Sequence, residues 1–232
     1  MRIKVLALIL VLMGTLGLVG CGQGAIFRGR TWAIVNNAST AGSATLTIPA
    51  TGTGNLIAVA LMFNGGTYVN SISDDAGNVY VSANAKAVVG NGSTEIWYAV
   101  NSKPGATVVN PTFADSPTHV EITVWEVSGI STSAPDAANT SSGNLTLDNT
   151  PGPAVTTTQV DDFILSILFV VDTSISGISS GNKFTNDFMT DGNGWAHITS
   201  SSAPAGTYQA SWITSTPQGV YCASTAAFRL AQ

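Results

Sequence analysis

One short stretch of this sequence concentrates oxygen-bearing side chains of the kind that bind a hard cation. Asp74, Asp75 and Asn78 surround the turn residue Gly77, and two carboxylates with an amide on a tight turn are ligands that Ca²⁺ accepts. A plain hairpin turn uses the same Asp-x-Gly-Asn pattern, because Gly and Asn tolerate positive φ angles. The stretch does not have the spacing of an EF-hand loop. Structural calcium at Asp74, Asp75 and Asn78 is therefore a hypothesis, with a plain turn as the alternative.

Histidines, which most often carry acid–base catalysis, are scarce. His119 and His197 are the only two, and the chain has no His-Glu-x-x-His pair. A serine or cysteine nucleophile needs a histidine base that a third group orients, and metal-dependent hydrolysis would need more histidines than these. Both histidines fall within expected strands, which favours a structural role for them. No catalytic residue is predicted.

Glycosidases need only two carboxylates, so the glutamates require separate consideration. Glu95, Glu121 and Glu126 are the only glutamates in the chain. Glu121 and Glu126 lie five residues apart in one expected strand and must point to opposite faces, so they cannot act as a pair. Glu95 and Glu126 on neighbouring strands leave a hydrolase open as the least favoured function.

Tryptophan is abundant for a chain of this size, which suggests carbohydrate binding. Sugar-binding sandwiches use exposed aromatic rings as stacking platforms, with amide and carboxylate side chains reading the hydroxyl groups around them. Gly192-Asn193-Gly194-Trp195 places Trp195 on an expected loop beside Asn193, which makes these two the preferred ligand-binding residues. Trp97, Trp125 and Trp212 alternate with polar neighbours and are further candidates. The alternative is that the tryptophans fill the core.

The elements that must position these residues are strands. Charged residues make up only 9% of the chain, and helical periodicity is nearly absent. Short β-branched or aromatic runs alternate instead with Gly, Asn, Asp, Pro and Ser turns, the pattern of an all-β sandwich or barrel. We predict a two-layer antiparallel β-sandwich of the jelly-roll or immunoglobulin-like kind. The expected strands cover residues 31–35, 44–48, 55–63, 69–73, 79–89, 94–100, 106–113, 119–128, 154–158, 163–171, 183–188, 195–200, 207–213 and 219–228.

Two of these strands and a set of weaker motifs suggest two similar halves. Residues 56–63 and 163–171 are apolar on both alternating faces, so each is expected to be a central strand covered on both sides. Gly54-Asn55 precedes the first and Asp161-Asp162 the second, and similar short motifs follow both in the same order. Chance similarity among Gly/Ser/Thr-rich strands is the alternative. Residues 131–153 would connect the halves, either as short edge strands or as a mobile segment.

Five motifs also resemble a family of secreted bacterial β-sandwich domains found in multi-domain surface proteins. They are Gly54–Ile57, Ser73–Tyr80, Ile96–Ala99, Glu126–Ile130 and Ala226–Arg229. The resemblance spans most of residues 50–229. It implies an immunoglobulin-like or jelly-roll sandwich and no particular activity.

The beginning of the chain has the features of an export signal. Arg2 and Lys4 precede an apolar run over residues 5–18 that is too short to span a membrane as a helix. The run ends in Leu18-Val19-Gly20-Cys21, which resembles the bacterial lipobox. The resemblance implies cleavage before Cys21 and a diacylglycerol on its thiol, with Gly22 at the next position pointing away from retention in an inner membrane. An ordinary secretory signal that happens to end in cysteine is the alternative.

These features predict the organisation of the chain. Residues 1–20 form a leader that is removed, residues 21–30 a short tether, and residues 31–232 a single β-sandwich domain. Loss of the leader with its two basic residues changes the formal charge from −5 to −7, which argues against nucleic acid as a partner. If Cys21 carries lipid, Cys222 has no disulfide partner and is expected to be a buried, inert thiol.

The predicted function is a cell-surface or periplasmic binding module that is anchored by lipid to the outer membrane or cell surface. Its ligand would be a glycan or a surface partner, and no cofactor other than structural calcium is expected. A structural or adhesive subunit that assembles through its strand edges is the alternative.

Overall fold

The computed structural model describes residues 33–42, 44–133, 135–145, 149–179, 183–190, 192–198, 203–216 and 218–231. Within these ranges the regular structure consists of nineteen β-strands with no helix, which confirms the all-β prediction. None of the described residues belongs to a helix with the length and hydropathy needed to cross a membrane. The predicted leader, Cys21 and the tether lie outside the described residues.

The first half of the chain forms a main sheet and a smaller sheet. The main sheet has the order β1-β9-β3-β7-β5, with β6 also paired to β7, and the smaller sheet has the order β2-β8-β4. All pairings are antiparallel. The strands are β1 (Ala33–Ala41), β2 (Leu46–Thr47), β3 (Leu56–Asn64), β4 (Val69–Asp74), β5 (Val81–Ser82), β6 (Ala87–Val89), β7 (Gly92–Ala99), β8 (Val108–Phe113) and β9 (His119–Ser128).

The second half repeats this arrangement. Its main sheet has the order β10-β19-β13-β16-β15, and two small sheets, β11-β18-β14 and β12-β17, accompany it. The strands are β10 (Ala137–Asn144), β11 (Thr150–Pro151), β12 (Val155–Thr156), β13 (Phe163–Val171), β14 (Ile175–Ile178), β15 (Thr185–Thr190), β16 (Asn193–Ile198), β17 (Thr207–Tyr208), β18 (Ser211–Thr214) and β19 (Val220–Phe228). The equivalent central strands are β3 and β13, flanked by β9 and β7 in one half and by β19 and β16 in the other.

The likeness of the halves extends to individual hydrogen bonds. Thr51 exchanges hydrogen bonds with Ala106 through its backbone and hydroxyl groups, and Thr157 does the same with Gly206. Gly54 has a φ of 77°, and Asp161, two residues before β13 as Gly54 is before β3, has a φ of 64°. This left-handed conformation suits glycine and is tolerated by aspartate. The prediction of two similar halves is therefore confirmed.

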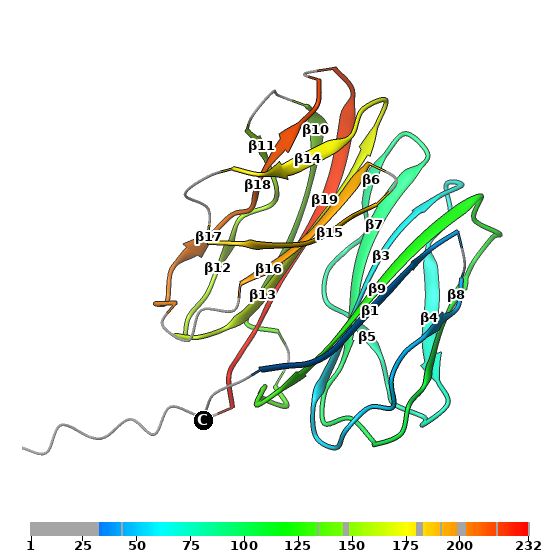
Figure 1. Ribbon diagram of the computed structural model, residues 1–232, viewed down its shortest axis with the longest axis vertical. Coiled ribbons are helices and arrows are strands. Elements are labelled where there is room, and N and C mark those ends of the chain that lie inside the picture. Colours follow the sequence, from blue (N-terminus) through cyan, green and yellow to red (C-terminus); the bar gives the residue numbers. More distant parts are fainter. Residues whose placement is uncertain are drawn as a thin grey trace, which may run out of the picture.

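Each half is a sandwich by itself, and the two main sheets pack face to face, so four layers follow one another across the molecule (Figure 1). In β3, Leu56, Ala58, Ala60 and Met62 pack toward the other main sheet, whereas the intervening residues pack under β2, β4 and β8. Strand β13 alternates in the same way between two cores. This confirms the prediction that both strands are covered on both sides. A two-layer arrangement describes each half, and the second apolar face of each main sheet explains why the halves join.

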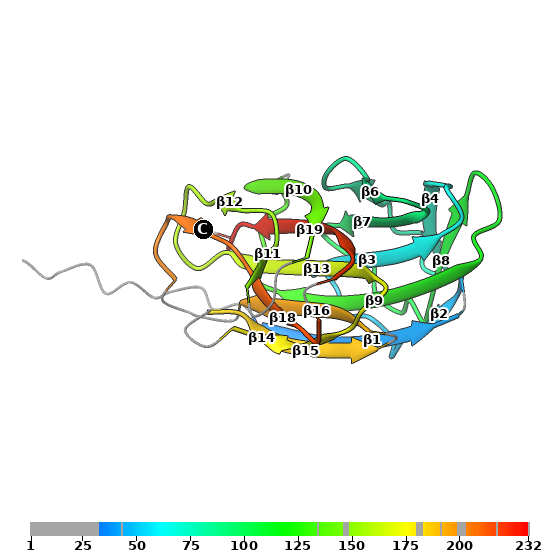
Figure 2. The same ribbon diagram turned by 90° about the horizontal axis from the view of Figure 1, so that it is seen from above.

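An approximate two-fold relates the halves. Strand β7 of the first half packs against β19 of the second, and the equivalent strands β9 and β16 are joined by a hydrogen bond between side chains, from Asn193 to Glu121. The two contacts differ in side-chain size. At the β7 contact there is no room for a side chain at position 92, because a Cβ added to Gly92 would lie 2.2 Å from the Phe169 ring. On the other side, the large side chains of Trp125 and Trp195 fill the space between the main sheets. Seen from above, β6 and β10 lie on one side of the molecule and β1 and β15 on the other (Figure 2).

The structure differs from the predicted strands mainly at the edges of the sheets. The connecting segment 131–153 contains β10 and β11, which agrees with the edge-strand alternative. The single strand expected over residues 79–89 is divided into β5 and β6. Two strands, residues 119–128 and 163–171, have the predicted bounds.

Candidate functional site

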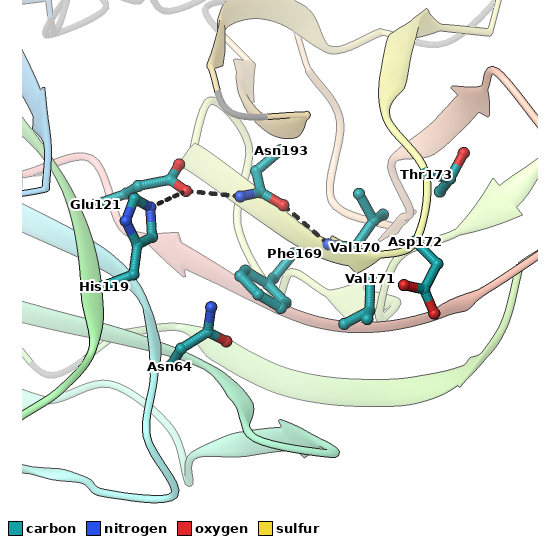
Figure 3. A pocket seen from close by; sticks show the side chains of 9 residues that line it. All are labelled: Asn64, His119, Glu121, Phe169, Val170, Val171, Asp172, Thr173 and Asn193. Carbon is teal, nitrogen blue, oxygen red and sulfur yellow. Dashed lines mark hydrogen bonds and ion pairs between the residues drawn. The ribbon is translucent and has the colours of Figure 1, made fainter.

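A cavity of about 480 Å³ opens at the seam between the two halves, where the ends of β3 and β13 meet (Figure 3). The first half contributes Asn64, His119 and Glu121 to its lining, and the second half contributes residues 169–173 and Asn193. Asn64 and Val171 are the last residues of the equivalent strands β3 and β13. The cavity, which we call the seam cavity, therefore lies close to the approximate two-fold.

The local pattern of each strand explains how these side chains reach the seam. In β9, Val120 and Ile122 point into the core of the first half, so the residues between and before them, Glu121 and His119, point toward the other main sheet. Asn193 is the first residue of β16 and follows Gly192, which has a φ of 83°. A side chain at position 192 would meet Thr173 and Ser174 at close range, so glycine allows the tight turn that brings Asn193 to the cavity.

A chain of hydrogen bonds crosses the seam through this cavity (Figure 3). The backbone N–H of Val170 donates to Asn193 Oδ1 at 2.9 Å. Asn193 Nδ2 donates in turn to Glu121 Oε1 at 2.7 Å, and His119 Nε2 lies 3.0 Å from the same oxygen. The Glu121 side chain is 0% exposed and Asn193 is 2% exposed, whereas the His119 side chain is 31% exposed. The chain therefore runs from the protein interior to a ring that reaches solvent.

The cavity can accept a polar ligand of small size. Its volume falls within the range of about 300–1,000 Å³ typical of small-molecule sites. Phe169 supplies an apolar ring, while Asn64, His119, Asp172 and Thr173 supply polar groups at the rim. Among the described residues, no three His, Cys, Asp or Glu side chains are grouped so that they could hold a metal ion.

The equivalent contact on the other side of the approximate two-fold is filled by smaller side chains. Met62 stands opposite Glu121 and Phe169 stands opposite Cys222, so Cys222 occupies the position of Glu121. Thr94, the counterpart of Asn193, bonds the Cys222 thiol and lies 2.8 Å from the Ser224 hydroxyl. Burial raises the pKa of Cys222 to about 12. The prediction that Cys222 is buried is confirmed, and the raised pKa disfavours the reactive thiolate form.

The prediction that Trp195 lies on an exposed loop is wrong. Residues 193–198 form β16, and Trp195 lies fully buried between the main sheets. Trp125 packs in the same core, where its Nε1 donates to Asp187 Oδ2 at 3.2 Å, and Trp212 lies in the core of the second half. These three rings cannot act as stacking platforms, because the second main sheet and the small sheets cover them. Trp97 is half-buried, and its Nε1 donates to Glu95 Oε2 at 2.8 Å.

The structure separates the two histidines in role. His197 Nδ1 lies 2.5 Å from Asp187 Oδ1, and both side chains are buried, as expected for a structural histidine. His119 lines the seam cavity instead and is partly exposed, so a purely structural role does not account for its position. Nothing in the sequence near His119 indicates this position, because the cavity forms only when the second half packs against the first.

The glutamates are placed as the strand pattern requires. Glu121 faces the seam, whereas Glu126 points to the other face of the sheet and accepts hydrogen bonds from Gly52 N and Asn55 Nδ2, each at 2.6 Å. This confirms their opposite orientation. Glu95 accepts hydrogen bonds from Trp97 and, at 3.1 Å, from the backbone of Val69, and burial raises its pKa. Glu95 and Glu126 are thus each engaged in separate structural contacts.

A serine motif also lacks a catalytic setting. Gly177-Ile178-Ser179-Ser180-Gly181 has the residue spacing of a hydrolase nucleophile elbow, which requires a turn from a strand into a helix. The described residues around it include β14 and no helix. Ser179 Oγ lies 3.4 Å from Ser211 Oγ on the neighbouring strand.

Asp74, Asp75 and Asn78, the residues of the predicted calcium site, are joined to the protein by many hydrogen bonds. Asp74 accepts hydrogen bonds from Ala76 N, Asn78 N, Asn78 Nδ2 and Tyr80 OH. Asp75 accepts them from Thr107 N, Thr107 Oγ1 and Val108 N. Asn78 Oδ1 accepts one from the backbone of Lys103, whose ammonium group bonds Gly77 O at 2.7 Å. The oxygens that would coordinate the ion are engaged by protein donors, and the Lys103 ammonium group lies beside them, which favours the plain turn.

Comparison of the chain with protein-family models, with curated proteins and with solved structures gives no match. The lipobox and the secreted β-sandwich family thus remain resemblances of sequence motifs.

Proposed function

We propose that this protein is a binding module at the outer membrane or cell surface, held there by lipid on Cys21, and that the seam cavity binds a glycan. The observation that carries the proposal is the convergence of Glu121 and Asn193 from different halves of the molecule on one cavity. A binding site needs polar groups that are fixed before the ligand arrives. The bonds from Val170 to Asn193 and from Asn193 to Glu121 supply this fixation.

The chemistry of the lining fits a ligand rich in hydroxyl groups. A carboxylate accepts hydrogen bonds and an imidazole can donate or accept one, so Asp172 and His119 suit hydroxyl groups as partners, while the buried Glu121 fixes His119. Phe169 offers an apolar surface to the carbon face of a sugar ring. In this proposal the tryptophans act as the framework of the seam rather than as the platform.

The experiment is a glycan panel followed by titration calorimetry on the unaltered protein and on variants. The proposal expects retention of at least one glycan and a loss of affinity of about tenfold or more in His119→Ala, equal to about 1.4 kcal/mol. His119 is partly exposed, so this variant should fold. Asp115→Asn, on an exposed loop outside the cavity, is the matched control and should bind normally. Binding that persists unchanged in both His119→Ala and Glu121→Gln would exclude the seam cavity, and a panel without any ligand would exclude a glycan.

A further inference from the structure

A buried pair of carboxyl groups lies in the second half, away from the seam cavity. Asp136 directly precedes β10, and Asp162 directly precedes β13. The Asp136 side chain is 0% exposed and Asp162 is 2% exposed. The pairing of β10 with β19 and of β19 with β13 brings the two residues to the same end of the main sheet, where their side chains interact. Two carboxylates buried next to each other repel, which favours a proton on one of them.

The donors around the pair decide which carboxyl group is protonated. Asp136 accepts hydrogen bonds from Thr158 N at 2.5 Å and Thr158 Oγ1 at 2.6 Å. It also accepts two from Arg229, at 2.8 Å from Nε and 2.6 Å from the terminal nitrogen. Neither side-chain oxygen of Asp162 receives a hydrogen bond from another donor group. Asp136 is therefore the carboxylate, and Asp162 is the acid.

The first half has a permanent donor at the position that corresponds to Asp162. Leu56 and Phe163 open the equivalent strands β3 and β13, so Asn55 occupies the position of Asp162. Asn55 Nδ2 donates to the buried carboxylate of Glu126 at 2.6 Å. In both halves, a neutral group directly before the central strand thus lies next to a carboxylate. Only the group of the second half, Asp162, can lose its proton.

The pair lies beside the segment that connects the halves. Ser131 N donates to Arg229 O and Asp136 N donates to Ala227 O, so the segment runs beside the end of β19. We infer that the Asp136–Asp162 pair is a proton-dependent clasp, which holds the start of β10 against β13 and β19 when Asp162 is protonated and loosens it when Asp162 ionises.

The charged and titratable groups around the pair set where this change occurs. Arg229 after β19 and Asp161 before β13 face the pair, and Tyr208 of β17 interacts with both Asp161 and Asp162. Burial and then the neighbouring Asp136 carboxylate raise the pKa of Asp162 to about 7, with Asp161 adding to the rise and Arg229 opposing it. The acid form is favoured in the folded protein, so its stabilising effect is complete below the ordinary carboxyl range and is lost as the pH rises toward about 7.

The direct test is a carboxyl-carbon NMR titration of the whole protein, assigned with Asp162→Asn. The inference expects one aspartate signal, absent from the variant, with a midpoint near pH 7. In thermal unfolding, the Tm of the unaltered protein should fall by about 5 °C relative to Asp162→Asn between pH 4.5 and pH 8. At pH 8.5 the amides of residues 136–140 should exchange about tenfold faster in the unaltered protein than in Asp162→Asn, and at pH 5 equally fast.

Asp115→Asn is the control for the loss of one exposed carboxylate, and its Tm should follow the unaltered protein at every pH. A midpoint below about pH 5 for Asp162 would overturn the inference. So would an identical pH dependence of Tm in the unaltered protein and Asp162→Asn. The titration is measured on the unaltered chain, so it remains decisive even if the variant does not fold.

Discussion

Asn193 has the most demanding position of any single residue at the seam. Its amide group bonds the Val170 backbone and the Glu121 carboxylate, so one side chain serves two buried partners. Removal of such a group deprives both partners of a bond where water is largely excluded. The side chain therefore acts in stability as well as in the proposed site.

Asn193→Ala should lower the free energy of unfolding by about 2–4 kcal/mol, because it deprives a buried carboxylate and a buried N–H of their bonds to the amide. Urea unfolding monitored by tryptophan fluorescence measures the change, since Trp195 and Trp125 lie in the same core. Asn91→Ala, in an exposed turn, is the control with the same side-chain change and should shift the value by less than about 0.5 kcal/mol. Equal effects in the two variants would contradict the assigned role.

Asp136 makes the opposite contribution to the pH profile from Asp162. Burial alone would raise its pKa, but the hydrogen bonds from Thr158 and Arg229 outweigh burial and lower the pKa of Asp136 to about 2. A lowered pKa means that the carboxylate stabilises the fold above the ordinary carboxyl range, and that this stabilisation is lost as the pH falls toward about 2.

The unaltered protein should therefore lose stability between about pH 4 and pH 2, as Asp136 becomes protonated. Asp136→Asn should be less stable than the unaltered protein at pH 5. Its urea midpoint, measured at each pH, should also fall less steeply between about pH 4 and pH 2. A urea midpoint that falls as steeply in Asp136→Asn as in the unaltered protein would show that other carboxylates cause the loss of stability in acid.

At the scale of elements, the contact between β7 and β13 depends on the absence of a side chain at Gly92. Gly92→Ala should destabilise the protein by about 1–3 kcal/mol, because its Cβ would overlap the Phe169 ring and push the main sheets apart. Gly177→Ala in β14, where an added Cβ meets no atom within 4 Å, is the control and should stay close to the unaltered value. Calorimetric unfolding of both variants gives the comparison.

The edges of the sheets are relevant to the alternative function, a structural subunit that assembles through its β-strands. An open edge can pair with another chain because its N–H and C=O groups lack partners. At β10, an edge strand, Asn84 Nδ2 donates to the carbonyl oxygen of Asn139 at 3.0 Å. This contact occupies part of the edge and weighs against pairing there.

Strands could be predicted where their local sequence pattern is sufficient to define them. Residues 119–128 and 163–171 are long apolar runs, and their predicted bounds are confirmed. Strand β10, with the sequence AANTSSGN, carries no hydrophobic alternation because it lies half-exposed at an edge. Asn193 was expected near a ligand site, but its partner Glu121 lies 72 residues away in the other half, and no local pattern connects them. Trp195 was misplaced for the same reason, since the surface that buries it belongs to the first half.

At the scale of the whole molecule, the anchor and the domain make a joint prediction about thiols. Cys21 and Cys222 are the only cysteines. If Cys21 carries a thioether-linked lipid, the membrane-extracted protein should give no reaction with a thiol reagent when native, because Cys222 is buried, and one thiol per chain when unfolded. Mass spectrometry of the amino-terminal peptide should show the added lipid. Two reactive thiols in the unfolded protein would contradict lipidation of Cys21.

The place of the seam cavity at the approximate two-fold has a consequence for valency. A site away from such an axis would occur twice in a molecule built of two similar halves. Here the halves have diverged: the equivalent of Glu121 is Cys222, which is buried in the filled contact and does not line the cavity, so the site occurs once. Each molecule would therefore hold one ligand. Avidity toward a polymeric ligand would have to come from the density of anchored molecules in the membrane, rather than from repetition within the chain.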